Sequence, residues 1–237
     1  LCFIPLMVFL WMGKVRASLK PHLFALLFLG GCQGLMGWYM VQSGLVDRPD
    51  VSQYRLTAHL GLAIAIYGYI VWLTIGLFSR ERQRKEAAAR SVFSIIGLVY
   101  LMILSGGFVA GTNAGLSFPT WPLMGDSFIP PALYRNGVTS AFEQVTTIHF
   151  NHRMLAYLTG AVLITAAVRG LLQSTDRRLK LASALMLTAV CFQIVLGIST
   201  VLSHVDLTVA AGHQSGAVVL LTTVLFWVHV FSTQSAD

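Results

Sequence analysis

Long apolar blocks separated by short polar connections make up most of this sequence. They run approximately over residues 1–12, 22–43, 57–78, 92–112, 144–171, 180–202 and 207–231. A helix needs about 20 apolar residues to cross the hydrocarbon core of a bilayer. Each of the six longer blocks therefore predicts a membrane-spanning helix. The first block is too short to span, and we interpret it as the end of a helix that starts upstream of Leu1.

The composition supports a membrane protein. The mean hydropathy is +0.72, 56% of the residues are hydrophobic and 11% are charged, whereas a soluble domain has about 25% charged residues. This excludes a soluble globule and a disordered chain. The three cysteines, Cys2, Cys32 and Cys191, all lie in apolar blocks, so we expect free thiols. The sequence predicts an all-α, polytopic transmembrane protein.

The positive charge of +7 is read as a topology signal and not as a nucleic-acid site, because Lys and Arg concentrate on the inner side of membrane proteins. Twelve of the 16 basic residues lie in or beside the first, third and fifth connections: Lys14, Arg16, Lys20, Arg80, Arg82, Arg84, Lys85, Arg90, Arg169, Arg177, Arg178 and Lys180. These connections are expected to face the cytoplasm or matrix. The chain is then a multi-pass protein of a bacterial or mitochondrial inner membrane.

A weak internal repeat predicts two related bundles. Gln33 and Gly37 precede His59, and Gln193 and Gly197 precede His213 in the same order. We expect an incomplete N-terminal bundle over 1–78, a charged linker over 79–91 and a C-terminal bundle over 92–231. Since the second bundle would have four helices, the first helix and part of the second are expected upstream of Leu1.

Three histidines are candidates for a buried site. His59, His152 and His213 each lie near the start of a predicted helix, on the periplasmic or intermembrane side. An ionisable side chain at membrane depth is costly and usually serves a cofactor, a cavity or a proton pathway. Paired imidazoles on facing helices can hold haem iron, while a packing or proton-relay role remains open. Structural zinc is less favoured, because no tight set of Cys and His is present.

The polar neighbours of His152 extend this candidate site. His149 lies three residues earlier on the same helix face and could move a proton or simply lie at the interface. Arg153 lies on the expected outer side, where basic residues are few. We therefore expect it to bind a porphyrin propionate or to pair with Glu143. The roles of His149 and of His204, in a short external connection, stay open. His22 and His229 are expected at the interface.

The longest external connection, 113–143, is rich in proline and aromatic residues. Proline cannot continue a helix, so this segment is expected to be a loop. It would lie on the membrane surface over a site or be merely interfacial.

Two segments resemble the haem A synthase family in its proteobacterial and mitochondrial branch. They are GGFVAGTNAGLSFPTWPL at 106–123, and Glu143 followed by TTIHFNHR at 146–153. The resemblance implies two four-helix bundles, and oxidation of a methyl group of haem O to a formyl group, giving haem A for cytochrome c oxidase. It implies haem b held by His152 and His213 in the second bundle, and the substrate haem on His59. The catalytic Glu, in a Glu-x-x-His-Arg motif, would lie upstream of Leu1, so residues 1–237 alone are expected to be inactive.

Two other functions fit the residues without the resemblance. One is a membrane b-type cytochrome that relays electrons without modifying haem, and the other is a proton-coupled transporter. For a haem A synthase, the expected partners are haem O synthase, oxidase assembly factors and the lipid bilayer. The sequence leaves open the electron acceptor, the oxygen source and the association of copies.

Overall fold

The structure, a computed structural model, describes residues 3–42, 51–79 and 86–233, and within them it is helical without strands. Its α-helices are α1 (Phe3–Trp11), α2 (Lys20–Val41), α3 (Gln53–Phe78), α4 (Glu86–Gly111), α5 (Ser140–Glu143), α6 (Val145–Gln173), α7 (Arg177–Leu202) and α8 (Leu207–Ser232). Single 3-10 turns lie at Ala17–Leu19, Ala114–Leu116 and Gly137–Thr139. Six of these helices are long and apolar enough to cross a membrane. The prediction of an all-α, multi-pass membrane protein is confirmed.

Two helices begin earlier than the hydropathy pattern predicts. α3 begins at Gln53 and α4 at Glu86, where starts at residues 57 and 92 were expected. The first turn of α3 is polar, and the start of α4 is rich in Glu and Ala, which are strong helix formers. The helical hydrogen-bonding pattern therefore continues past the apolar block. Part of the expected 79–91 linker is helix, and residues 80–85 lie outside the described residues.

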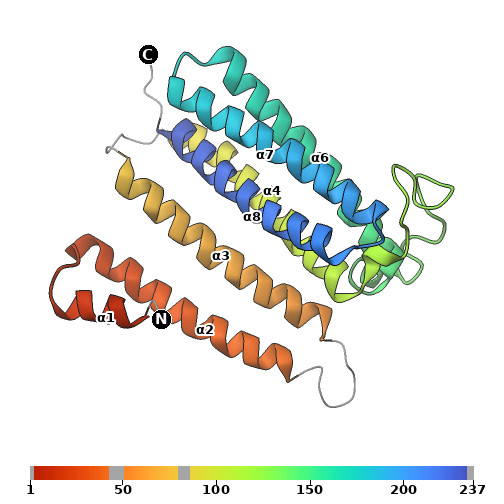
Figure 1. Ribbon diagram of the computed structural model, residues 1–237, viewed down its shortest axis with the longest axis horizontal. Coiled ribbons are helices and arrows are strands. Elements are labelled where there is room, and N and C mark those ends of the chain that lie inside the picture. Colours follow the sequence, from red (N-terminus) through yellow and green to blue (C-terminus); the bar gives the residue numbers. More distant parts are fainter. Residues whose placement is uncertain (1–2, 43–50, 80–85, 234–237) are drawn as a thin grey trace.

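The helices run up and down, so their connections gather at two ends (Figure 1). We call one the basic end; it holds the start of α2, the start of α4 and the 174–176 connection between α6 and α7. The other, the loop end, holds the long 112–139 connection and the 203–206 turn. Asp176 and Asp206 cap α7 and α8 by accepting bonds from backbone N–H groups of the first turn.

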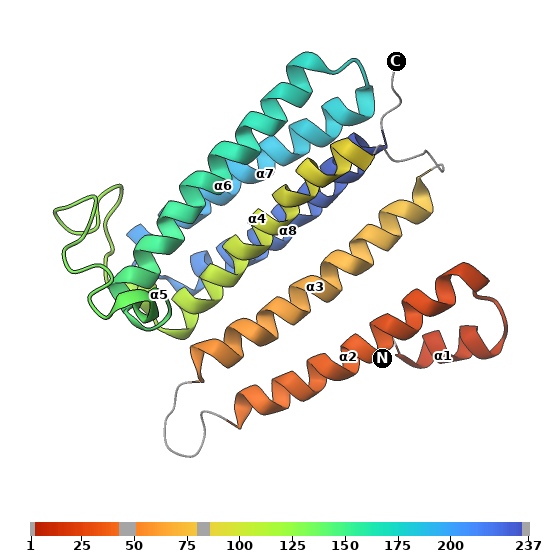
Figure 2. The same cartoon turned by 180° about the vertical axis from the view of Figure 1, so that it is seen from behind.

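Four helices form a closed bundle in which α6 and α8 lie on a diagonal. Each of these two helices packs on α4 and on α7. α3 packs along α4 and α8 from outside the bundle, and α2 packs on α3 (Figure 2). The division of the chain into two bundles, over 1–78 and 92–231, stays a prediction.

The bundle is packed tightly toward the basic end. Leu163, Met186 and Val224 are fully buried there, and Trp227 donates a hydrogen bond to Ser183 Oγ at 2.9 Å. Toward the loop end, none of the described residues over 191–202 and 207–219 of α7 and α8 is buried, whereas α6 is still buried at His149 and Arg153. The loop-end halves of α7 and α8 are therefore less covered by their neighbours.

Candidate functional site

The ring of His213 lies against α7, where it contacts two residues one turn apart, Gln193 and Gly197. Gln193 Nε2 donates to the backbone oxygen of His213 at 2.9 Å and lies 3.2 Å from its ring Nδ1. A Cβ on Gly197 would come within 2.9 Å of His213 Cε1, closer than real Cβ contacts allow. The imidazole therefore needs glycine at position 197. Within the described residues no hydrogen bond reaches His213 Nε2.

His59 repeats this arrangement on α2. Gln33 Nε2 donates to the backbone oxygen of His59 at 3.1 Å and lies 3.3 Å from its ring Nε2. A Cβ on Gly37 would come within 3.1 Å of His59 Cε1. The two copies of the sequence repeat therefore make similar contacts with a histidine of the following helix. They differ in one respect: the glutamine faces Nε2 of His59 but Nδ1 of His213.

His152 has a different polar neighbour, on α4. Its Nδ1 lies 2.7 Å from Ser105 Oγ, and the Ser105 hydroxyl donates its proton to the backbone oxygen of Met102 at 2.8 Å. Since a hydroxyl has one proton, Ser105 must accept from Nδ1–H of His152. The lone pair of the imidazole is then on Nε2, and no described residue bonds to that nitrogen. A Cβ on Gly106 would lie 3.4 Å from Cε1 of this ring, an ordinary contact distance.

His152 and His213 are the two histidines that could hold a cofactor within the closed bundle. They lie on the diagonal helices α6 and α8, both toward the loop end. A metal-binding imidazole ordinarily holds its second nitrogen in a hydrogen bond, as both do here. No group of three or more His, Cys, Asp or Glu side chains among the described residues could hold a bare metal ion.

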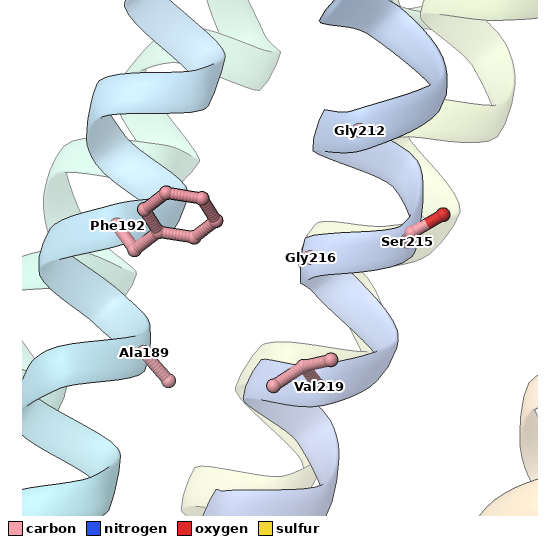
Figure 3. A pocket seen from close by; sticks show the side chains of 6 residues that line it. All are labelled: Ala189, Phe192, Gly212, Ser215, Gly216 and Val219. Carbon is pink, nitrogen blue, oxygen red and sulfur yellow. The ribbon is translucent and has the colours of Figure 1, made fainter.

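A shallow groove lies between α7 and α8 near His213 (Figure 3). Its volume is about 220 Å³, and its lining residues are Ala189, Phe192, Gly212, Ser215, Gly216 and Val219. Since Phe192 and Val219 are exposed, the groove opens on the outer face of these two helices and not into the bundle.

Arg153 binds the long loop rather than Glu143. Its Nη1 donates to the Leu123 carbonyl at 3.1 Å and its Nη2 to the Phe118 carbonyl at 2.9 Å, while Nε donates to His149 Nε2 at 3.1 Å. Glu143 accepts a hydrogen bond from Tyr54 instead, at 3.1 Å. The pairing of Arg153 with Glu143, one of two expected alternatives, is wrong, because the loop carbonyls lie nearer to the guanidinium.

The long loop is held along the first turns of α6. Gln144 donates to the Ala132 carbonyl at 2.8 Å, and Tyr134 donates to Asn151 at 3.0 Å. With the Arg153 contacts, these bonds place the 112–139 segment against the end of the bundle that holds His152. The loop is therefore part of the surroundings of the candidate site.

The remaining histidines lie apart from this site. His204 is exposed in the 203–206 turn. His22 Nδ1 lies 2.6 Å from Tyr69 Oη near the basic end. His229 is buried, with its Nε2 3.0 Å from Ser79 Oγ and its ring against Trp72. His229 lies in the last turn of α8, where α3 covers it, and its expected place at the membrane interface stays a prediction.

Sequence reasoning did not assign roles to Gln193 and Ser105. The Gln-x-x-x-Gly repeat was visible, but it did not show that the glutamine reaches the histidine of the next helix. Ser105 gave no signal, because a serine in an apolar helix usually bonds to its own backbone. Only the rotation of α4 toward α6 brings it to the imidazole.

Comparison with known proteins shows a match along most of the chain. Residues 1–225 match the family model COX15-CtaA, described as cytochrome oxidase assembly protein. "Heme A synthase" of Nitrosospira multiformis is 43% identical over 238 residues, covering 96% of this chain and 65% of that protein. "Heme A synthase" of Paramagnetospirillum magneticum is 39% identical, with 93% and 65% covered. "Heme A synthase COX15" of Bos taurus is 38% identical, with 90% and 55% covered. The chain thus spans about two thirds of the length of these bacterial relatives.

Proposed function

Because this chain belongs to the COX15-CtaA family of cytochrome oxidase assembly proteins, we propose that it is the larger part of a haem A synthase. The reaction is oxidation of a methyl group of haem O to the formyl group of haem A. Relatives named "Heme A synthase" support it, at 43% and 39% identity. The observation in this molecule that carries the proposal is the pair His152 and His213, on diagonal helices of one bundle, each with Nδ1 in contact with a polar side chain of a neighbouring helix.

His152 and His213 would hold a haem b in the loop-end half of the closed bundle. Bound haem b would supply electron transfer. Ser105 orients His152 by accepting from its Nδ1–H. Arg153 keeps one free N–H on each terminal nitrogen beyond its bonds to Leu123 and Phe118, so it can still bind a propionate at the loop end.

His59 would bind the substrate haem. It lies at the loop end of α3, outside the closed bundle, and its imidazole rests on Gly37 of α2. A second contact site for the substrate, and the acid that acts on it, would come from elsewhere in the whole protein. Haem O itself would come from an enzyme that attaches an isoprenoid chain to haem b, and the product would pass to oxidase assembly.

We place the protein in a bacterial or mitochondrial inner membrane, with the loop end on the periplasmic or intermembrane side. This orientation puts Lys20, Arg177 and Arg178 at the basic end on the inner side, in agreement with the positive-inside rule. Cleavage of the 112–139 loop by a protease added to the outer side of right-side-out vesicles, or labelling of a cysteine introduced into this loop by a thiol-reactive probe from that side, would support it. Access only after lysis would reverse the orientation.

The test of the proposed activity is haem analysis of the protein purified at its natural length. Pyridine haemochrome spectra and chromatography of the extracted haems should show haem B together with haem O or haem A. Haem B alone would instead indicate a cytochrome that relays electrons without modifying haem. A protein without bound haem would point to a transporter.

A further inference from the structure

Part of the long loop is far more apolar than a water-exposed connection needs to be. Residues 117–134, which we call the apolar hairpin, read SFPTWPLMGDSFIPPALY and include one charged residue, Asp126. Large apolar side chains of the hairpin remain exposed: Trp121 44%, Leu123 41%, Phe128 47% and Ile129 65%. Exposed apolar side chains gathered in this way ordinarily mark a surface that binds another protein or a membrane.

The hairpin is a compact turn with paired backbone groups at its tip. The Met124 N–H donates to the Ser127 carbonyl at 2.8 Å, across a turn in which Gly125 has a φ of +70°. The Thr120 hydroxyl donates to the Leu123 carbonyl and accepts from the Gly125 N–H, both at 2.9 Å. Since unpaired backbone groups are costly in lipid, this internal pairing suits the turn to an apolar environment.

The hairpin is attached to the side of α6, well past the first turn of that helix. Arg153 holds the Phe118 and Leu123 carbonyls, and the Phe128 ring stacks on the Tyr157 ring, with centroids 6.3 Å apart and planes at 13°. The backbone of Tyr157 lies more than three turns into α6, about 18 Å from its start. Figure 2 shows the loop beside this end of α6. The hairpin therefore extends back along a membrane-spanning helix.

The side of α6 that contacts the hairpin continues into a surface that faces lipid. Tyr157, Leu158 and Leu172 are exposed, on a helix long and apolar enough to cross a membrane. α6 has 29 residues, a length of about 43 Å, which exceeds the hydrocarbon core of about 30 Å. Its first turns therefore extend past the core, which puts the stack of Phe128 on Tyr157 near the level where the hydrocarbon begins. Aromatic side chains are enriched at that level.

We propose that the apolar hairpin lies in the bilayer leaflet at the loop end, with phospholipid as its partner. Trp121, Phe128 and Ile129 contact the headgroup region and the upper acyl chains. Asp126 limits the depth, because an ionised carboxylate must stay in contact with headgroups or water. Lipid then holds the loop from one side while Arg153 holds it from the bundle. Neither contact uses haem, so the inference does not depend on the proposed function.

The test is nitroxide spin labelling of the full-length protein in phospholipid nanodiscs, measured by power saturation of the EPR signal. The natural cysteines are replaced by alanine, and a labelled cysteine is introduced as Ile129→Cys or, in a second variant, as Leu123→Cys. Oxygen concentrates in lipid, whereas a nickel chelate stays in water. Oxygen should therefore relax both hairpin labels more strongly than the nickel chelate does. Asn136→Cys, exposed on the same loop outside the hairpin, is the matched control and should show the reverse.

Nickel relaxation of the hairpin labels equal to that of the control label would overturn the inference, because the hairpin would then lie in water. Protection of the hairpin labels from both reagents would also overturn it, because a protein surface, such as a second copy of this chain, would then be the partner. Two labelled positions keep the test informative if one variant does not fold. Haem content is measured separately, so a protein without haem would contradict the proposed function and leave the result for the hairpin unaffected.

Discussion

Arg153 donates a hydrogen bond from Nε to Nε2 of His149, one helical turn earlier on α6, at 3.1 Å. The same guanidinium holds the carbonyls of Phe118 and Leu123. A single buried side chain therefore joins the long loop to the turn of α6 that carries His152. The position of the loop and the surroundings of the candidate haem ligand depend on each other through this contact.

Replacement of this arginine by lysine should release the loop. Arg153→Lys keeps the charge, but a single ammonium group lacks the planar fork that spans two carbonyls and an imidazole. Hydrogen bonds to charged groups are worth about 1.5–3 kcal/mol each, so amide exchange over residues 118–123 should become at least about tenfold faster. Hydrogen exchange with mass spectrometry would measure it. Arg135→Lys, exposed on the same loop, is the control, and equal exchange in both variants would contradict the role of Arg153.

The three histidines at the loop end should separate into two groups on replacement by alanine. His152→Ala and His213→Ala should each lose most of the haem b, because in the proposed function both histidines would hold the same haem. His59→Ala should keep it, because His59 lies on α3, outside the closed bundle. The measurement is the Soret absorbance per protein, with His204→Ala in the exposed turn as control. Full haem b content in the His152 or His213 variant would refute the assignment of that ligand.

Ser105 should matter through its bond to His152. Ser105→Ala removes the acceptor for Nδ1–H and should weaken haem retention about 10- to 100-fold. Ser105→Thr keeps a hydroxyl group at the same position and should retain haem close to the wild-type level. Competition for haem with apomyoglobin would give the two values. If the alanine variant retains haem as well as the threonine variant does, the hydroxyl does not orient His152.

The packing of the basic end should be sensitive to a single methyl group. Gly170→Ala would place a Cβ on the Ser183 hydroxyl and 3.3 Å from Trp227 Nε1, in the tightly packed half of the bundle. Such overpacking typically costs about 1–3 kcal/mol. Gly97→Ala is the matched control, since nothing lies within 4 Å of its Cβ, and alanine there should be neutral or stabilise α4. Unfolding in mixed micelles with rising SDS would compare them, and equal stabilities would contradict the packing described.

The sequence was sufficient to predict the helices and the three principal histidines. Both depend on local properties: the length of an apolar block, and the cost of an imidazole at membrane depth. The starts of α3 and α4 were placed too late, because hydropathy marks the apolar stretch and not the end of the hydrogen-bonded helix. The six spans themselves are confirmed.

Contacts between helices could not be predicted in the same way. The partners of Arg153 are 30 and 35 residues away in the sequence, on an irregular loop. A hydrophobic pattern along the chain does not indicate contacts between residues so far apart. The burial of His229 depends on how α3 packs against α8, and the bond of Ser105 to His152 depends on the rotation of α4. Only the Gln-x-x-x-Gly repeat indicated a contact between helices from the sequence, because both copies keep the same residues and similar contacts with a histidine.

The uneven packing of the bundle bears on how a prosthetic group would enter. The Trp227–Ser183 bond and the fully buried Leu163, Met186 and Val224 hold the helices together at one end. The half that contains His152 and His213 can then widen without unfolding the rest. We expect the polypeptide to insert and assemble first, and a flat tetrapyrrole to slide in later between spans that are already anchored.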